Sequence, residues 1–175
     1  MSSSPAVAPP ADASALVLGV GTEHRGDDAV GLRVAERLRS SGPPSGTTVL
    51  TLSTDGTRLI DAWDGAGLVV VVDALSSGGR PGTVERIEVG AAPLPSSTRL
   101  SSTHGLSLAE AVALGQSLHR MPSRLVIYAI EGGRFGIGEP LSAEVEAAVA
   151  PVARRVAEEI VRAPAPRAEP EAHHA

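Results

Sequence analysis

Three side chains in this 175-residue sequence, Asp28, Asp73 and His104, have types and positions that could do chemistry together. Asp28 lies at the end of a glycine-containing loop, Asp73 directly follows the apolar run LVVVV, and His104 stands in STHGL before a helical stretch. Each lies at the carboxyl end of a predicted strand or in a loop that leads into a predicted helix. Because functional groups gather outside the carboxyl ends of parallel strands, we expect the three side chains to converge on one rim.

Two carboxylates and one imidazole form a site that suits nickel, zinc or a similar divalent ion. Without a metal, two carboxylates held close together repel each other, which raises the pKa of one of them and creates a general acid/base pair. The chain contains no cysteine, which excludes a disulfide scaffold, a thiol nucleophile and a Cys-ligated zinc or iron–sulfur site. Any bound metal would therefore need His, Asp and Glu ligands.

Each acidic or imidazole group also has a purely structural interpretation. Asp27 could cap the following helix while Asp28 complements the helix dipole. Asp73 could be a turn residue in DALSSG, and His104 a loop or capping residue. Glu131, at the end of a later predicted strand, could line the same rim, but it is interpreted as a solvated loop acid.

The first glycine loop, GVGTEHRGDDAVG, invites comparison with dinucleotide-binding loops. Gly19 and Gly21 fit that pattern, but it needs a further glycine where His24 stands. The loop also contains three acids, which would repel a pyrophosphate near the helix N-terminus. A nucleotide-binding α/β module is therefore an alternative that the loop chemistry opposes.

The elements that must position these residues alternate along the chain. The strand Thr-Val-Glu-Arg-Ile-Glu-Val alternates apolar and polar residues, which is typical of a strand exposed on one face. Ser107 and Glu110 have the spacing of a capping box. The predicted strands are 15–20, 47–52, 68–72, 83–89 and 124–130, and the predicted helices are 29–39, 59–63, 106–118 and 143–162. Alternation of this kind predicts a three-layer α/β/α sandwich with a mainly parallel central sheet of about five strands.

Composition supports one domain and limits its partners. The chain is 42% apolar but has one Trp, one Tyr and one Phe, so aliphatic residues must build the core. Its net charge of −5 and its low content of aromatic residues argue against nucleic-acid binding. No apolar run approaches the ~20 residues that span a bilayer, and the N-terminus lacks a basic region, so we expect a cytoplasmic protein without membrane contact. We predict a single domain at 14–162 between flexible tails at 1–13 and 163–175.

At these residues the chain resembles the hydrogenase maturation proteases, from about residue 16 to residue 149. The likeness consists of five separate blocks in the same order. They are VLGVGTEHRGDDAVGLRVAERL, STDGT, VVVVDALSSGGRPGTV, STHGLSLAEAVAL and IEGGRFGIGEPLSAEVEAAV. Three positions depart from the family's usual pattern: Thr22 stands where Asn is usual, Asp28 where some members carry Glu, and Gly56 where many show a glycine pair.

The resemblance implies an endopeptidase whose partner is the large-subunit precursor of a nickel–iron hydrogenase. The enzyme would remove the C-terminal extension of that precursor after nickel insertion, with the nickel carried by the substrate as recognition element. Asp28, Asp73 and His104 match the family's metal-contacting positions, and they are the residues expected to be catalytic, by aspartic-type or metal-assisted hydrolysis. We expect the protein to be a monomer.

Two other interpretations remain open at the level of sequence. One is a protease of the same fold that acts on another precursor with its own divalent metal in place of nickel. The other is a non-catalytic chaperone that keeps the site only to sense a metal.

Overall fold

The computed structural model describes residues 15–53, 56–90 and 107–163. His104 and almost all of the two predicted tails lie outside these ranges. The elements follow in the order β1 (Ala15–Val20), the 3-10 helix η1 (Gly26–Ala29), α1 (Val30–Ser41), β2 (Thr47–Leu52), α2 (Gly56–Trp63), β3 (Leu68–Leu75), β4 (Val84–Val89), α3 (Leu108–Ser117), β5 (Arg124–Glu131) and α4 (Ala143–Arg162).

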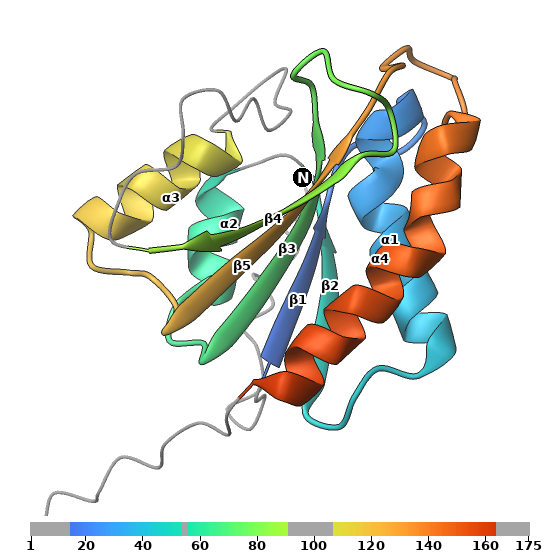
Figure 1. Ribbon diagram of the computed structural model, residues 1–175. Helices are drawn as coiled ribbons and strands as arrows, with labels where there is room; N and C mark the ends of the chain where they lie inside the picture. The colour runs from blue at the N-terminus through green and yellow to red at the C-terminus, as the bar shows by residue number, and fades with distance from the viewer. Residues whose placement is uncertain (1–14, 54–55, 91–106, 164–175) are drawn as a thin grey trace, which may run out of the picture.

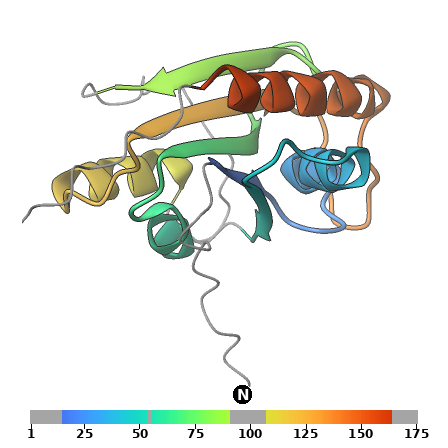
Figure 2. The same ribbon diagram turned by 90° about the horizontal axis from the view of Figure 1, so that it is seen from below.

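The sheet has five strands in the order β2-β1-β3-β5-β4. The pairs β1–β2, β1–β3 and β3–β5 are parallel, and β4 runs antiparallel to β5. Helices α1 and α4 cover one face of the sheet, and α2 and α3 cover the other (Figures 1 and 2). The predicted three-layer α/β/α sandwich with a mainly parallel sheet is confirmed.

Strand β3 is the central strand of the sheet and is buried on both faces. All eight of its residues are buried. Its side chains alternate between two cores, with Val70 and Val72 facing α1 and α4, and Val69 and Val71 packed with the residues of α2 and α3. A continuous run of β-branched residues suits such a strand because neither face meets water.

Strand β3 is longer than the sequence predicted. Its pairing with β5 continues to Leu75, in register with Glu131, so that Asp73 lies inside the strand opposite Ala129 rather than beyond its end. By the alternation of the strand, Asp73 belongs to the face that α2 and α3 cover. The sheet therefore holds the backbone of Asp73 in a regular hydrogen-bonded ladder.

The local signals at the other elements agree with the structure. β4 is an edge strand whose side chains are exposed or partly buried, which agrees with the predicted strand exposed on one face. Ser107 caps α3 and forms the full capping box with Glu110. Among the described residues, no helix has both the length and the apolar character needed to cross a membrane.

A charged cluster of Arg86, Glu88, Arg124 and Glu159 joins α4 to β4 and β5. Both oxygens of Glu159 accept hydrogen bonds, from Arg86 at 2.8 and 2.9 Å and from Arg124 at 2.8 Å. The hydroxyl of Tyr128 donates to the same carboxylate at 3.1 Å. The hydrogen bonds from Arg86 are the largest cause that lowers the pKa of Glu159 to about 2.

We predict that Glu159→Gln lowers the free energy of unfolding at pH 7 by about 1–3 kcal/mol, because hydrogen bonds to a charged group are lost. The pKa of Glu159 in the folded protein lies below its ordinary value of 4.5, so the stabilisation is fully present above pH 4.5 and is lost as the pH falls toward 2. Urea unfolding should therefore show a smaller difference between variant and wild type at pH 3.

Glu158→Gln is the matched control, because within the described ranges this neighbouring carboxylate makes only an exposed contact, with Arg162 at 3.2 Å. We expect the control to change the stability by less than about 0.5 kcal/mol. A loss for Glu159→Gln that is equally large at pH 3 and pH 7 would contradict the prediction.

Candidate active site

Asp73 is completely buried at the carboxyl end of the central strand. One of its oxygens, Oδ1, accepts a hydrogen bond from the backbone N–H of Ala74 at 2.8 Å. The other, Oδ2, is buried and has no hydrogen-bond partner among residues 15–53, 56–90 and 107–163. Burial raises the pKa of Asp73 well above its usual range, and the charge of Asp28 raises it further. A carboxylate in this state is suited to hold a proton or to meet a cation.

Asp28 lies in η1, the short helix that leads from β1 into α1, and is 5% exposed. Its charge acts on Asp73, so the structure places the two acids close together at the carboxyl edge of the sheet. His104 lies outside the described residues, and its position beside them remains a prediction. The catalytic and metal-binding roles of all three likewise remain predictions.

Glycines make this approach of the two acids possible. A Cβ at Gly21 would collide with the backbone oxygen of Asp28. A Cβ at Gly31, in the first turn of α1, would collide with the backbone oxygens of Val20 and Val72. The helix start can therefore sit directly on the ends of β1 and β3, which brings Asp28 to Asp73.

The glycine loop is used for packing and not as a phosphate cradle. A Cβ at Gly19 would meet the backbone oxygen of Gly31 and, at 2.7 Å, the Cβ of Ala35. The space that Gly19 leaves open is thus filled by α1. This geometry agrees with the chemical argument against nucleotide binding.

Asp27 does not cap a helix, so that interpretation was wrong. The N-cap residue of α1 is Ala29. The carboxylate of Asp27 instead contacts a segment that is distant in the sequence. It accepts hydrogen bonds from the backbone N–H groups of Gly133, Arg134 and Ser142 at 2.8, 2.9 and 2.6 Å, and from the Ser142 hydroxyl at 3.0 Å. Burial alone would raise the pKa of Asp27, but these hydrogen bonds outweigh it, and the pKa lies below its usual range.

Glu131 is not a solvated loop acid, so that interpretation was also wrong. It is 2% exposed, at the end of β5. Its carboxylate accepts from the backbone N–H groups of Ser77, Gly78 and Gly79 at 2.8, 2.9 and 3.0 Å, and from the Ser77 hydroxyl at 2.7 Å. Its function in the fold is to hold the turn that follows β3.

Within the described residues, no group of three or more His, Cys, Asp and Glu side chains is arranged to hold a metal ion. Asp28 and Asp73 provide two of the three predicted ligands, and the third falls outside those residues. The unpartnered oxygen of Asp73 and the neighbouring carboxylate are nevertheless hard oxygen donors of the kind that accept a divalent cation.

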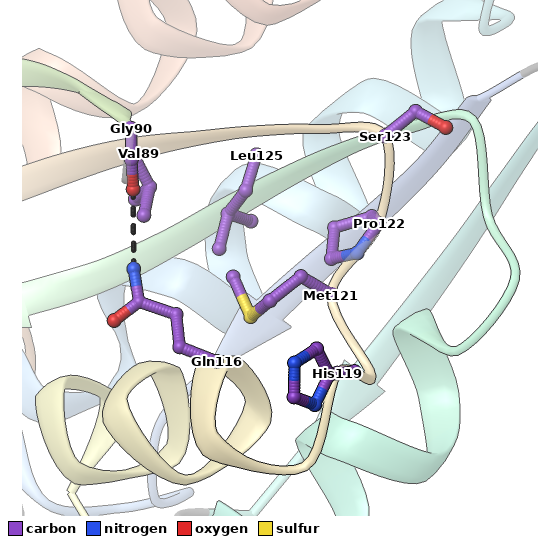
Figure 3. Close-up of a pocket in the computed structure, with 8 residues that line it drawn as sticks. All are labelled: Val89, Gly90, Gln116, His119, Met121, Pro122, Ser123 and Leu125. Atoms are coloured by element: carbon purple, nitrogen blue, oxygen red, sulfur yellow. Dashed lines mark hydrogen bonds between the residues drawn. The ribbon is translucent and has the colours of Figure 1, made fainter. Parts of the chain in front are cut away.

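The structure also has an open pocket of about 660 Å³ away from these acids (Figure 3). It is bordered by Leu125 near the amino end of β5 and by Val89 at the end of β4, whereas Asp73 and Glu131 lie at the carboxyl ends of β3 and β5. Gln116 spans the pocket edge by donating to the backbone oxygen of Gly90 at 3.1 Å. The pocket is therefore at the opposite end of the sheet from the candidate site.

Fold and site together define an α/β/α protein with a pair of buried acids at the carboxyl edge of its sheet. The model of one family, hydrogenase maturation protease, matches residues 32–159, which is well over half of the chain. The chain belongs to the hydrogenase maturation protease family.

Curated relatives carry the name hydrogenase expression/formation protein HupD. The protein from Thiocapsa roseopersicina is 31% identical over 121 residues, covering 69% of this chain and 55% of the relative. That from Bradyrhizobium diazoefficiens is 28% identical over 113 residues, covering 64% and 59%. The chain thus spans a little more than half the length of these relatives.

Solved structures of similar proteins share the fold over most of both chains. The hydrogenase maturating endopeptidase HybD from E. coli is 26% identical with a TM-score of 0.69, covering 81% of this chain and 88% of that one. The [NiFe] hydrogenase maturation protease HycI from Thermococcus kodakarensis is 27% identical with a TM-score of 0.63, covering 86% and 94%.

We predict that Gly31→Ala destabilises the protein, because the new methyl group overlaps the backbone oxygens of Val20 and Val72. Alanine gains about 1 kcal/mol over glycine in a helix, and the overlap costs about 1–3 kcal/mol, so the net loss should reach up to about 2 kcal/mol. Urea unfolding measures it. Gly90→Ala, where a Cβ would meet open space, is the control. Unchanged or increased stability of Gly31→Ala would contradict the close approach of α1 to the sheet.

We also predict that Asp73→Asn raises the free energy of unfolding at neutral pH. Because folding raises the pKa of Asp73 above its ordinary value of 3.8, the wild type loses stability as the pH rises from that value toward the folded-state pKa. Asparagine does not ionise, so the advantage of the variant should grow between pH 4 and pH 7 in urea unfolding. Asp61→Asn, at an exposed position that contacts Arg120 at 3.1 Å, is the control for replacing an acid by its amide. A difference that stays constant with pH would refute the prediction.

Proposed function

We propose that the protein is an endopeptidase that removes the C-terminal extension of a nickel–iron hydrogenase large-subunit precursor after nickel has been inserted. The observation that carries the proposal is the pairing of Asp28 with the buried Asp73, whose Oδ2 has no hydrogen-bond partner in the part of the chain that the structure describes. Membership of the hydrogenase maturation protease family supports the choice of substrate.

The nickel of the precursor is the group that this site would recognise. A buried carboxylate oxygen without a partner is costly, and a cation brought by the substrate would relieve that cost. The same cation would weaken the repulsion between Asp28 and Asp73, so the pair would favour a loaded precursor over an empty one. Recognition of this kind makes cleavage depend on complete nickel insertion.

His104 would complete the contacts to the nickel, since imidazole and carboxylate are both suitable ligands. Helix α3 (Leu108–Ser117), which begins a few positions after His104 in the sequence, packs on the face of the sheet to which Asp73 belongs. This placement of α3 supports the assignment of His104 to the site.

In the hydrolytic step, a water oxygen attacks the carbonyl carbon of the scissile peptide bond. The carboxylate of Asp28 takes the proton from this water and returns it to the leaving amine as the C–N bond breaks. Asp73 and His104 hold the nickel end of the precursor and so fix the peptide beside the water. The extension leaves as a peptide with a free amino terminus.

A cleavage assay tests this function. The purified protein is mixed with the large-subunit precursor from the same source, with and without nickel, and the precursor is followed by intact mass. We expect loss of a C-terminal peptide only from the nickel-loaded form. Asp28→Ala, Asp73→Ala and His104→Ala should each lower kcat at least about 100-fold, since they remove proton transfer or positioning.

Glu23→Gln is the matched control, because this acid lies in the same loop but is exposed and contacts only Arg33, at 3.5 Å, among the described residues. It should retain full activity. If nickel-loaded precursor that is known to be processed in its own cell were left intact by the wild type, the proposal would fail.

A further inference from the structure

Two buried carboxylates that the proposed chemistry does not use lie on either side of one short segment. Residues 131–134 begin with Glu131, which binds the turn at Ser77–Gly79. They end with Gly133 and Arg134, whose N–H groups bind Asp27. The loops that follow β3 and β5 lie together at the same end of the sheet (Figure 1).

Both carboxylates accept hydrogen bonds from donors inside the protein. Asp27 and Glu131 both accept four hydrogen bonds, and within the described residues neither forms an ion pair. Hydrogen bonds to a charged acceptor are stronger than those to a neutral one, and they offset the cost of burying the carboxylate. A carboxylate bound in this way acts as a rigid anchor, because any loop movement would break several bonds at once.

Each anchor also lies next to one of the two acids of the site. Asp27 directly precedes Asp28, so fixing one residue limits the other. Glu131 fixes the turn that follows β3, the strand that carries Asp73. The N–H of Gly132 adds a bond to the backbone oxygen of Leu75 at 2.8 Å, which ties the segment to the same strand.

Backbone contacts strengthen the link on the Asp28 side. The N–H of Asp27 donates to the backbone oxygen of Arg134 at 2.7 Å, and that of Gly138 donates to His24 at 2.6 Å. Gly132 has no room for a side chain, because a Cβ would lie 2.9 Å from the Cβ of Asp27. These contacts join the segment to the first loop.

We infer that Asp27 and Glu131 are positioning residues, which act through residues 131–134 to set the separation of the Asp28 and Asp73 carboxylates. This role deepens the proposed endopeptidase function and rests on it for its effect on catalysis. The geometric part, that the two anchors determine where the acids lie, is independent of the substrate.

The test uses Asp27→Asn and Glu131→Gln in the full chain, measured well below the unfolding temperature. Each amide keeps the shape of the side chain but turns an NH₂ group toward N–H donors. We expect kcat for the nickel-loaded precursor to fall about 10- to 100-fold with KM within about threefold, because displaced acids slow the chemistry more than binding. Crystal structures of the variants should show a changed separation of the Asp28 and Asp73 carboxylates.

Glu139→Gln is the matched control, since this exposed carboxylate of the same loop accepts a single hydrogen bond among the described residues, from Gly136 at 3.3 Å. It should leave kcat and the separation unchanged. If one variant does not fold, the other still decides. Unchanged kcat in a folded variant, or a lowered kcat with the two acids unmoved, would overturn the inference. If the wild type itself does not cleave, the proposed function fails, and the crystallographic separation alone decides the positioning role.

Discussion

The close approach of α1 to the ends of β1 and β3 is the constraint on which the site depends. Gly31 lets the first turn of the helix touch the backbone oxygens of Val20 and Val72, and Gly21 leaves room for the backbone of Asp28. A side chain at either position would push the helix start away from the sheet. Asp28 lies in η1, which leads directly into this helix. The distance between the helix start and the sheet therefore also determines how strongly the two acids interact.

The buried acids at this edge differ in how many hydrogen bonds their carboxylates accept. That difference separates the acids with a structural role from the candidate for a chemical role. Among the described residues, Asp27 and Glu131 each accept four hydrogen bonds from N–H and hydroxyl donors. Asp73 accepts one, from Ala74, and burial together with the charge of Asp28 raises its pKa. A buried carboxyl group whose pKa is raised by burial and by a neighbouring acid is a candidate for function.

Much of the fold could be predicted because its signals are local. Buried strands can be recognised in the sequence as apolar runs. The apolar faces of helices, and the capping box of Ser107 and Glu110, depend only on residues within one or two turns. The extension of β3 through Asp73 could not be predicted, because it depends on pairing with β5. The roles of Asp27 and Glu131 were missed for the same reason, since their donors lie 106–115 and 52–54 residues away in the sequence. Only the glycines of EGGR hinted at a close backbone approach there.

The two-sided aliphatic core explains how the chain tolerates so many acids at one edge. Every residue of β3 is buried, and Trp63 is enclosed with its ring N–H donating to the backbone oxygen of Arg120 at 3.0 Å. Such a core supplies stability that is independent of the rim, so repulsion between Asp28 and Asp73 can be kept without unfolding the protein. A cation carried by the substrate would remove that repulsion only while it is bound. Under the proposed function, relief of this repulsion would favour binding of the nickel-loaded precursor over the unloaded one.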